Sequence, residues 1–380
     1  MMEFEVEDPW SYRTPARKGT KPNLFWRTLG IVIASASIGA ASAAVLLLND
    51  DTAANPTAVV ERVETQIVTA EASATPAAAV ALRVLPSIVT VQIGLIEGTS
   101  FTPTGSGSGV VIDASGTLVT NEHVVGGAAA VRVVFANGKS YEAEVVGTDS
   151  ITDIAVITID AIGLTAVELG SSVDMSIGDP AIAIGSPLGL AGGPSVTVGV
   201  LSAFERRVQV AVDAELFGML QTDAPITRGS SGGALVDSEG RLIGITSAIG
   251  VSDVGAEGLG FAIPVEMMTR ITQDILEFGV AKHAFLGITG STHFENEVDG
   301  AIAPAGVSVG SVIEGTAADA AGLEVGDIIQ SVDGQSVSTM DGLVVRLRFH
   351  RVGDIAHLQI SRGGEVLSID MELLERPEGV

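Results

Sequence analysis

A serine in a glycine-rich turn and a histidine after an apolar strand are the residues of this chain best suited to chemistry. Residues 227–235 read TRGSSGGAL, and residues 120–125 read TNEHVV. The chain has no cysteine, and of its five histidines only His123 lies in the large central region. A protease-like nucleophile there must therefore be a hydroxyl, and His123 is the candidate for its base.

Acyl transfer by a serine also needs a carboxylate that orients the imidazole. Asp153 opens the apolar run DIAVITI (153–159), so its backbone would be anchored in a sheet while its carboxylate lies at the edge of a core. Asp149 is the rival, placed second because it stands in a more polar turn. The order His123, Asp153, Ser231 is that of chymotrypsin, and it differs from the order in subtilisin and the α/β-hydrolases.

The oxyanion of such a reaction needs backbone N–H donors. Ser231 is flanked by Gly229, Ser230, Gly232 and Gly233. Glycines permit positive φ angles and close backbone approach, so two N–H groups can point at one position. The predicted oxyanion donors are the amides of Gly229 and Ser231.

Composition limits the alternatives. The 380 residues carry a formal charge of −26, so nucleic acid is not an expected partner. The absence of cysteine excludes disulfides and thiolate metal sites. His283, His293, His350 and His357 share no metal-ligand spacing and are interpreted as surface or hinge residues, so no metal and no cofactor are expected.

One apolar segment predicts the topology. Residues 29–48, LGIVIASASIGAASAAVLLL, are long enough for a transmembrane helix of roughly 20 residues. Arginines and lysines precede this segment and Asp50 and Asp51 follow it, which places residues 1–28 in the cytoplasm and the rest outside. A cleaved signal peptide is the alternative, because Ala41-Ser42-Ala43 resembles a cleavage site.

The remaining sequence divides into a linker and two folded units. Residues 49–78 are rich in Ala, Thr, Glu and Pro and predict an extracytoplasmic linker. Short β-branched runs separated by glycine turns follow, and they indicate an antiparallel barrel or sandwich. A helix is expected at 265–279, ended by Gly279, with a boundary near 281. The second unit combines short strands with helices at 316–322 and near 340–350.

The central region resembles the trypsin-like proteases of the high-temperature-requirement (HtrA/Deg) family. The motifs include VLPSIVTV (84–91), TNEHVV (120–125), DSITDIAV (149–156), QTDAPITRGSSGGALVD (221–237) and GLGFAIP (258–264). The resemblance implies a mainly β fold, with a double six-stranded β-barrel over 79–280 and His123, Asp153 and Ser231 as its triad. Two positions depart from the family: Ser230 replaces an asparagine, and the turn at 185–189 reads Gly-Ser-Pro-Leu-Gly.

The resemblance also implies how a peptide substrate is held. Thr246, Ser247 and Ala248 are expected to offer an edge strand that pairs with an extended peptide. Pro225 and Ile226 are expected in the wall of the specificity pocket, with no acid at its base. A small aliphatic residue such as valine or alanine is then expected before the cleaved bond.

The C-terminal unit, residues 281–376, resembles the α+β PDZ domain attached to these proteases. The segment FLGI (285–288) precedes GLEVGDII and VDG at the spacing of that domain. Backbone amides near Leu286, Gly287 and Ile288 are therefore expected to capture a peptide C-terminus.

Two hypotheses about function follow. In the first, the chain is a membrane-anchored extracytoplasmic serine endoprotease that degrades misfolded or signal-bearing proteins, with regulation linked to its PDZ domain. The family resemblance adds a homotrimer and a site switched by loops near 189–195, 225–230 and 249–258. In the second, the chain is a chaperone or PDZ scaffold whose protease site is silent or rarely engaged.

Overall fold

The computed structural model describes most of the chain after residue 74. The described residues are 75–186, 193–211, 214–247, 259–296 and 300–376. The predicted anchor at 29–48, and with it the cytoplasmic tail at 1–28, lies outside them. Within these ranges, no helix has both the length and the apolar character that a membrane span requires.

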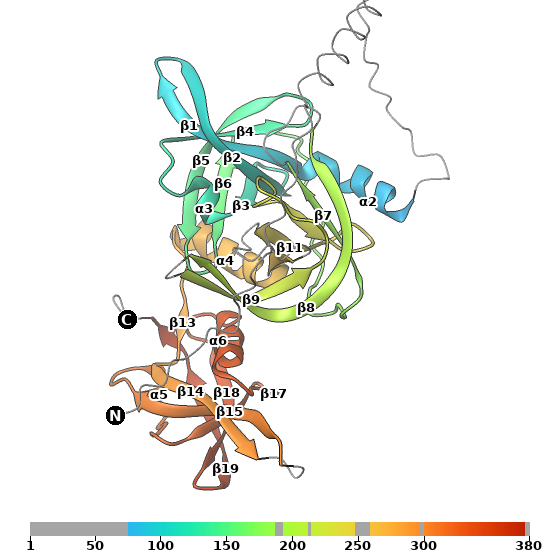
Figure 1. The fold of residues 1–380 in the computed structure, drawn as a ribbon. Coiled ribbons are helices and arrows are strands. Elements are labelled where there is room, and N and C mark those ends of the chain that lie inside the picture. Colours follow the sequence, from blue (N-terminus) through green and yellow to red (C-terminus); the bar gives the residue numbers. More distant parts are fainter. Residues whose placement is uncertain (1–74, 187–192, 212–213, 248–258, 297–299, 377–380) are drawn as a thin grey trace, which may run out of the picture. The chain divides into compact units, whose positions relative to one another are not determined.

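The first half of the described chain folds into a closed antiparallel barrel (Figure 1). Its strands are β1 (Ile88–Glu97), β2 (Ser100–Asp113), β3 (Thr117–Thr120), β4 (Ala130–Phe135), β5 (Ser140–Asp149) and β6 (Ile154–Ile159). They pair in the order β1-β2-β3-β6-β5-β4. Closure leaves none of these strands at an edge, and their β-branched residues suit this pleated, half-buried surface.

A second closed barrel follows, with the strand order β10-β11-β12-β9-β8-β7. Its strands are β7 (Pro180–Gly185), β8 (Ser195–Ala211), β9 (Ala214–Thr222), β10 (Ala234–Val236), β11 (Leu242–Ser247) and β12 (Gly260–Pro264). A shared hydrophobic core joins the barrels: Val110 and Val156 of the first belong to the same buried cluster as Ile184 and Ile245 of the second. The two barrels therefore share one apolar core.

Two helices flank this core. Helix α2 (Pro76–Val84) begins inside the predicted linker 49–78, so the linker prediction is wrong for residues 76–78. Proline at the first helical position is pre-organised for a helix, and Val80 and Val84 are buried against the core. The short 3₁₀ turn η1 (Leu85–Ser87) then leads into β1.

Helix α4 (Val265–Phe278) confirms the helix predicted at 265–279. Gly279 ends it with a φ of 78°, the left-handed conformation that glycine adopts without a Cβ penalty. Met268, Ile271 and Ile275 are buried as the periodicity predicts, whereas Phe278 is exposed and lies under the ammonium group of Lys282.

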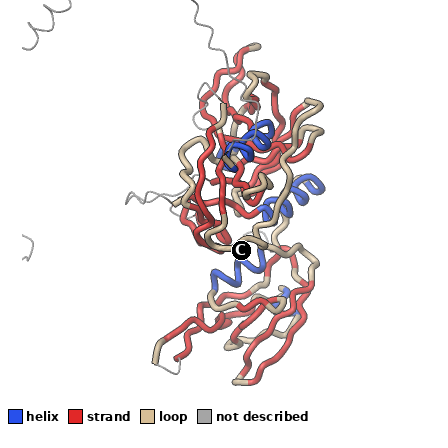
Figure 2. Tube along the Cα trace, turned by 90° about the vertical axis from the view of Figure 1, so that its right-hand side faces the viewer, coloured by secondary structure: helices blue, strands red, loops and turns tan. Residues whose placement is uncertain are grey.

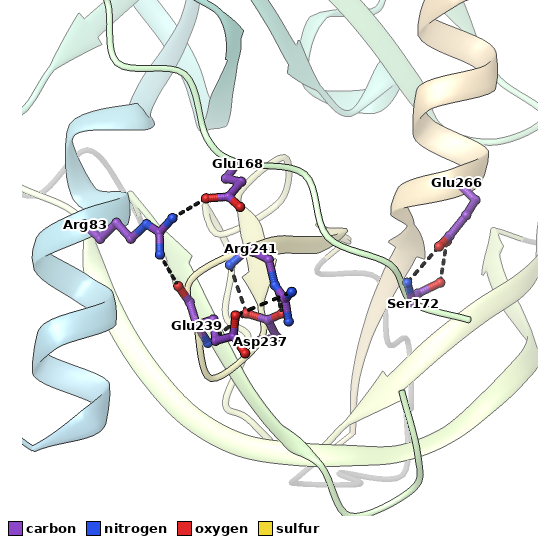
Figure 3. Close-up of polar contacts among 7 residues, drawn as sticks. All are labelled: Arg83, Glu168, Ser172, Asp237, Glu239, Arg241 and Glu266. Carbon is purple, nitrogen blue, oxygen red and sulfur yellow. Dashed lines mark hydrogen bonds and ion pairs between the residues drawn. The ribbon is translucent and has the colours of Figure 1, made fainter. Parts of the chain in front are cut away.

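The segment between the barrels is fixed at two points (Figure 3). Arg83 of α2 forms an ion pair with Glu168 and donates to the carbonyl oxygen of Glu239 at 2.8 Å. At the other point, the Ser172 amide donates to Glu266 of α4 at 2.7 Å. These contacts tie the inter-barrel segment to both flanking helices.

The C-terminal domain is built on a five-stranded antiparallel path, β14-β15-β16-β18-β19, with β14 at one edge. Its strands are β13 (Ala284–Phe285), β14 (Ile288–Asn296), β15 (Ile302–Val312), β16 (Ile328–Val332), β17 (Gln335–Ser336), β18 (Ile355–Arg362), β19 (Glu365–Glu372) and β20 (Leu374–Glu375). Helix α6 (Met340–Arg348) confirms the helix predicted near 340–350, while α5 (Ala317–Ala320) is shorter than the predicted 316–322. Leu286, Leu343 and Ile360 belong to a separate buried core.

Strands dominate the described residues, as the tube in Figure 2 shows. The expectation of a mainly β double barrel followed by an α+β domain is confirmed.

Two glycines with positive φ provide a matched test of the first barrel. A Cβ at Gly116 would lie 2.2 Å from the carbonyl oxygen of Ile159, whereas a Cβ at Gly138 meets nothing within 4 Å. Gly138→Ala should lower the free energy of unfolding by about 1 kcal/mol through backbone strain alone. Gly116→Ala should cost roughly 1–3 kcal/mol more, because the barrel must also shift. Urea unfolding measures both; equal losses would contradict the packing described here.

Candidate active site

Asp153 and His123 are in direct contact. The His123 Nδ1 lies 2.9 Å from both Asp153 carboxyl oxygens, and the His123 amide donates to Oδ1 at 3.1 Å. The Asp153 side chain is 7% exposed and that of His123 is 38% exposed. The imidazole is therefore held by its Nδ1 edge.

Several backbone and side-chain groups fix Asp153 in place. Its carbonyl oxygen accepts from the Glu122 amide at 3.1 Å and from the Asn121 side-chain amide at 2.9 Å. Its Oδ2 accepts from the hydroxyl of Ser247 at 3.1 Å. Asp153 has a φ of 61°, so it closes a turn before β6 and does not extend the strand as the sequence predicted. A non-glycine residue keeps this conformation only where its surroundings over-determine it.

Ser231 lies in the turn that precedes β10 of the second barrel, and it is 7% exposed. Gly229 and Gly232 have φ angles of 89° and 83°, so both glycines occupy conformations that side chains disfavour. A Cβ at Gly232 would lie 2.4 Å from the Thr120 hydroxyl and 3.2 Å from the Asn121 amide. The Ser231 turn is therefore next to the segment that leads into His123.

Ser108 of β2 holds the same turn from the first barrel. Its hydroxyl donates to the carbonyl oxygen of Gly229 at 2.6 Å and accepts from the Ser186 amide at 2.8 Å. Its backbone amide donates to the carbonyl oxygen of Ser231 at 2.7 Å. One buried serine thus connects the turn, β2 and the residue that follows β7.

Asp149, the rival carboxylate, faces elsewhere. Its Oδ1 is 2.9 Å from the Nε2 of His283. Burial alone would raise the pKa of Asp149, but the hydrogen bond and charge of His283, together with bonds from Thr152 and Ile151, hold that pKa below its ordinary value. His283, interpreted from sequence as a surface or hinge residue, is therefore a largely buried partner of this carboxyl group.

The expected substrate strand needs a correction. Thr246 lies inside β11, which pairs with both β10 and β12, so it is no edge residue. Its amide donates to the carbonyl oxygen of Gly233 at 2.8 Å, and its carbonyl oxygen accepts from Gly232 at 2.8 Å. Ser247 is the buried last residue of β11, and Ala248 lies outside the described residues.

The two predicted pocket residues lie against the second barrel. The Pro225 carbonyl oxygen accepts from the Thr197 hydroxyl at 2.8 Å. Ile226 packs against the core of that barrel, and its side chain closely approaches Gly260.

The predicted peptide-binding residues of the C-terminal domain line a cavity of about 200 Å³. Leu286, Gly287 and Ile288 form one wall, and Leu343 and Leu347 of α6 form another. Gly287 has a φ of 88°, and a Cβ there would lie 2.0 Å from the Thr316 hydroxyl, so only glycine fits. The edge strand β14 begins at this cavity, which suits the addition of a peptide strand.

Sequence analysis missed three supporting residues, Asn121, Ser108 and the hydroxyl of Ser247. Asn121 stands within the TNEHVV motif, so its position two residues before His123 was the available signal. Ser108 and Ser247 carried no comparable signal, because their partners lie far away in the sequence. Where the chain is described, no group of three or more His, Cys, Asp or Glu residues could hold a metal ion.

Family models match both folded units. A model of the trypsin-like peptidase domain matches residues 107–245, and a model of the PDZ domain matches residues 278–373. Together with the two barrels, these matches define a trypsin-like peptidase fold joined to a PDZ domain.

Curated relatives and solved structures agree with that class. The chain is 40% identical over 272 residues to the periplasmic serine endoprotease DegP of Salmonella typhimurium, covering 70% of this chain but 56% of that protein. It is 36% identical over 310 residues to the chloroplastic Protease Do-like 1 of Arabidopsis thaliana, covering 77% of this chain and 70% of that protein. The solved HtrA-type protease AlgW with tripeptide is 34% identical, with a TM-score of 0.63 over 78% of this chain and 96% of that one.

The chain belongs to the HtrA family of trypsin-like serine proteases with a PDZ domain. It spans little more than half the length of the DegP proteins that it matches.

The bridging role of Ser108 gives a prediction about the turn. Ser108→Ala removes the donor to the Gly229 carbonyl and the acceptor of the Ser186 amide. Because both partners lose a hydrogen bond in a largely buried setting, the free energy of unfolding should fall by about 1–3 kcal/mol. Amide hydrogen exchange at residues 229–233 should also accelerate. The exposed Ser100→Ala serves as control, and equal effects of the two substitutions would refute the bridge.

Proposed function

We propose that this chain is a serine endoprotease that uses Ser231 as nucleophile, His123 as general base and Asp153 as the group that orients His123. The observation that carries the proposal is the contact of Asp153 with His123 beside the Ser231 turn. Membership of a family whose named relatives include serine endoproteases supports the same reading.

The chemistry follows from the orientation of the imidazole. With Nδ1 bound to Asp153, the remaining nitrogen of His123, Nε2, is the atom that takes the proton from the Ser231 hydroxyl. Ser231 Oγ then attacks the peptide carbonyl carbon, and His123 returns the proton to the leaving amine. The amides of Gly229 and Ser231 are proposed to stabilise the oxyanion, since the positive φ angles at Gly229 and Gly232 curl the turn between them.

Substrates are proposed to be misfolded or signal-bearing polypeptides. Pro225 and Ile226 offer an apolar surface, which favours valine or alanine before the cleaved bond. The cavity at Leu286, Gly287 and Ile288 is proposed to take a peptide C-terminus. Ser247 and Ala248 remain the proposed substrate strand, without Thr246, which is paired on both sides within β11.

Location and assembly are part of the proposal. Residues 29–48 are proposed to anchor the chain, with the tail at 1–28 in the cytoplasm and the folded domains of 79–280 and 281–376 outside. DegP of Salmonella typhimurium is named as periplasmic, which agrees with an extracytoplasmic site. A homotrimer, and loops near 189–195, 225–230 and 249–258 that switch the site, are proposed from the family resemblance.

Labelling by a fluorophosphonate probe separates this proposal from the chaperone or scaffold alternative. The full-length chain should react stoichiometrically, and Ser231→Ala should abolish labelling because the nucleophile is gone. Ser230→Ala is the matched control, since it alters the neighbouring hydroxyl and should still label. Absence of labelling in the wild type with peptide activators present would favour the scaffold.

Cleavage of a peptide library tests the specificity pocket. The wild-type chain should cleave mainly after valine or alanine, because no acid is expected at the base of the pocket. Mass spectrometry of the products, with Ser231→Ala as the blank, identifies the residue before each cut. Dominant cleavage after lysine or arginine would refute the assignment of Pro225 and Ile226.

A further inference from the structure

A second histidine–aspartate pair holds the turn that carries Asp153. The His283 Nε2 donates to Asp149 Oδ1 at 2.9 Å, and the side chains are 13% and 6% exposed. The Asp149 carboxyl group also accepts from the Thr152 hydroxyl at 2.5 Å and from the Ile151 amide at 3.3 Å. Asp149, whose carboxyl group orders the turn, is therefore hydrogen-bonded to His283, which follows α4 and lies 134 positions further along the chain.

This turn needs external support. The φ of 61° at Asp153 is a conformation that costs a non-glycine residue roughly 1–2 kcal/mol. Besides the contacts of Asp149, Arg348 Nη1 donates to the carbonyl oxygen of Ile151 at 3.2 Å. If the turn relaxed, the Asp153 carboxyl group would move relative to His123, and displacements of about 1 Å in such sites can cost about 100-fold in rate.

We propose that His283 is a positioning residue for the triad: through its hydrogen bond to Asp149 it holds the turn that presents Asp153 to His123. The inference rests on the proposed function, because the position of Asp153 affects turnover only if His123 and Ser231 catalyse the reaction.

Other charged groups surround the pair. Arg270 of α4 and Arg348 of α6 both act on the Asp149 charge. Burial lowers the pKa of Arg348 to about 10, so its guanidinium stays charged at pH 8. Burial also lowers the pKa of Arg270, whose Nη1 is 3.2 Å from Asp274 Oδ2. Arg376, whose amide donates to the His283 carbonyl oxygen, adds a further cation.

The hydrogen bonds to Asp149 oppose the effect of its burial. Burial would raise the pKa of Asp149, but the bonds from His283, Thr152 and Ile151 hold that pKa below its ordinary value. A substitution that removes the His283 donor leaves a buried carboxylate with one hydrogen bond fewer, which is costly.

Turnover of a peptide substrate by the full-length chain tests the inference. His283→Ala removes the donor to Asp149 and should lower kcat about tenfold with KM unchanged, because the turn that presents Asp153 loses support while the substrate contacts remain. His283→Gln keeps a donor at this position and should recover most of the wild-type kcat.

A surface pair supplies the matched control. His357 contacts Asp370 at 2.8 Å, but the two side chains are 63% and 73% exposed, so His357→Ala should leave kcat unchanged. A wild-type kcat in His283→Ala, in an enzyme that turns over, would overturn the inference and leave the proposed function standing.

Amide exchange of residues 149–153 in the Ser231→Ala background measures the stability of the turn independently of activity. His283→Ala should accelerate this exchange and His283→Gln should not, and unchanged exchange in His283→Ala would also overturn the inference. If exchange responds to His283→Ala while the wild type shows neither turnover nor Ser231-dependent labelling, the proposed function fails, and the positioning role of His283 in catalysis fails with it.

Discussion

The site depends on satisfying one buried carboxyl group. Asp153 is almost fully enclosed, and a buried group of this kind is costly unless every oxygen is hydrogen-bonded. His123 supplies the contacts on one side and Ser247 the contact on the other. Because His123 follows β3 of the first barrel and Ser247 ends β11 of the second, one carboxyl group connects both barrels. The geometry of the proposed base follows from that requirement.

Backbone conformation and one buried serine hold the turn that carries Ser231, the proposed nucleophile. The turn at 229–233 uses glycines where a Cβ would collide with its surroundings, as at Gly232. Ser108 then fastens the turn to β2 through Gly229 and Ser231. Donors and a nucleophile that are held in place in this way meet the condition for electrostatic catalysis, and this is the role proposed for the turn.

Much of this arrangement could be predicted from the sequence. The sequence ranked Asp153 above Asp149 as the partner of His123, and in the structure His123 contacts Asp153 while Asp149 contacts His283. The catalytic roles of His123, Asp153 and Ser231 stay predictions. Helix α4 and its end at Gly279 could also be predicted, because helical periodicity and a terminal glycine are local signals. The double barrel followed by an α+β domain came from motifs that extend over most of the described chain.

The remainder depends on distant partners that a single sequence does not reveal. Thr246 was expected at an edge from the family resemblance, and the residues of a single strand do not say which strands pair with it on either side. His283 gave no signal of its own, since its partner Asp149 lies 134 positions away. Residues 76–78 looked like linker, yet Pro76 starts a helix whose apolar face has a core to pack against.

The two carboxyl groups of the turn allow the most direct test of the account. The measurement is kcat for peptide hydrolysis by Asp153→Asn and Asp149→Asn, two substitutions of equal size and charge change in the same five-residue turn. The account predicts a loss of about 10⁴-fold for Asp153→Asn, because the imidazole loses its orienting acceptor. Asp149→Asn should lose only about tenfold, because it acts through the turn. An equal loss in both variants, or a larger loss in Asp149→Asn, would contradict the central role of Asp153.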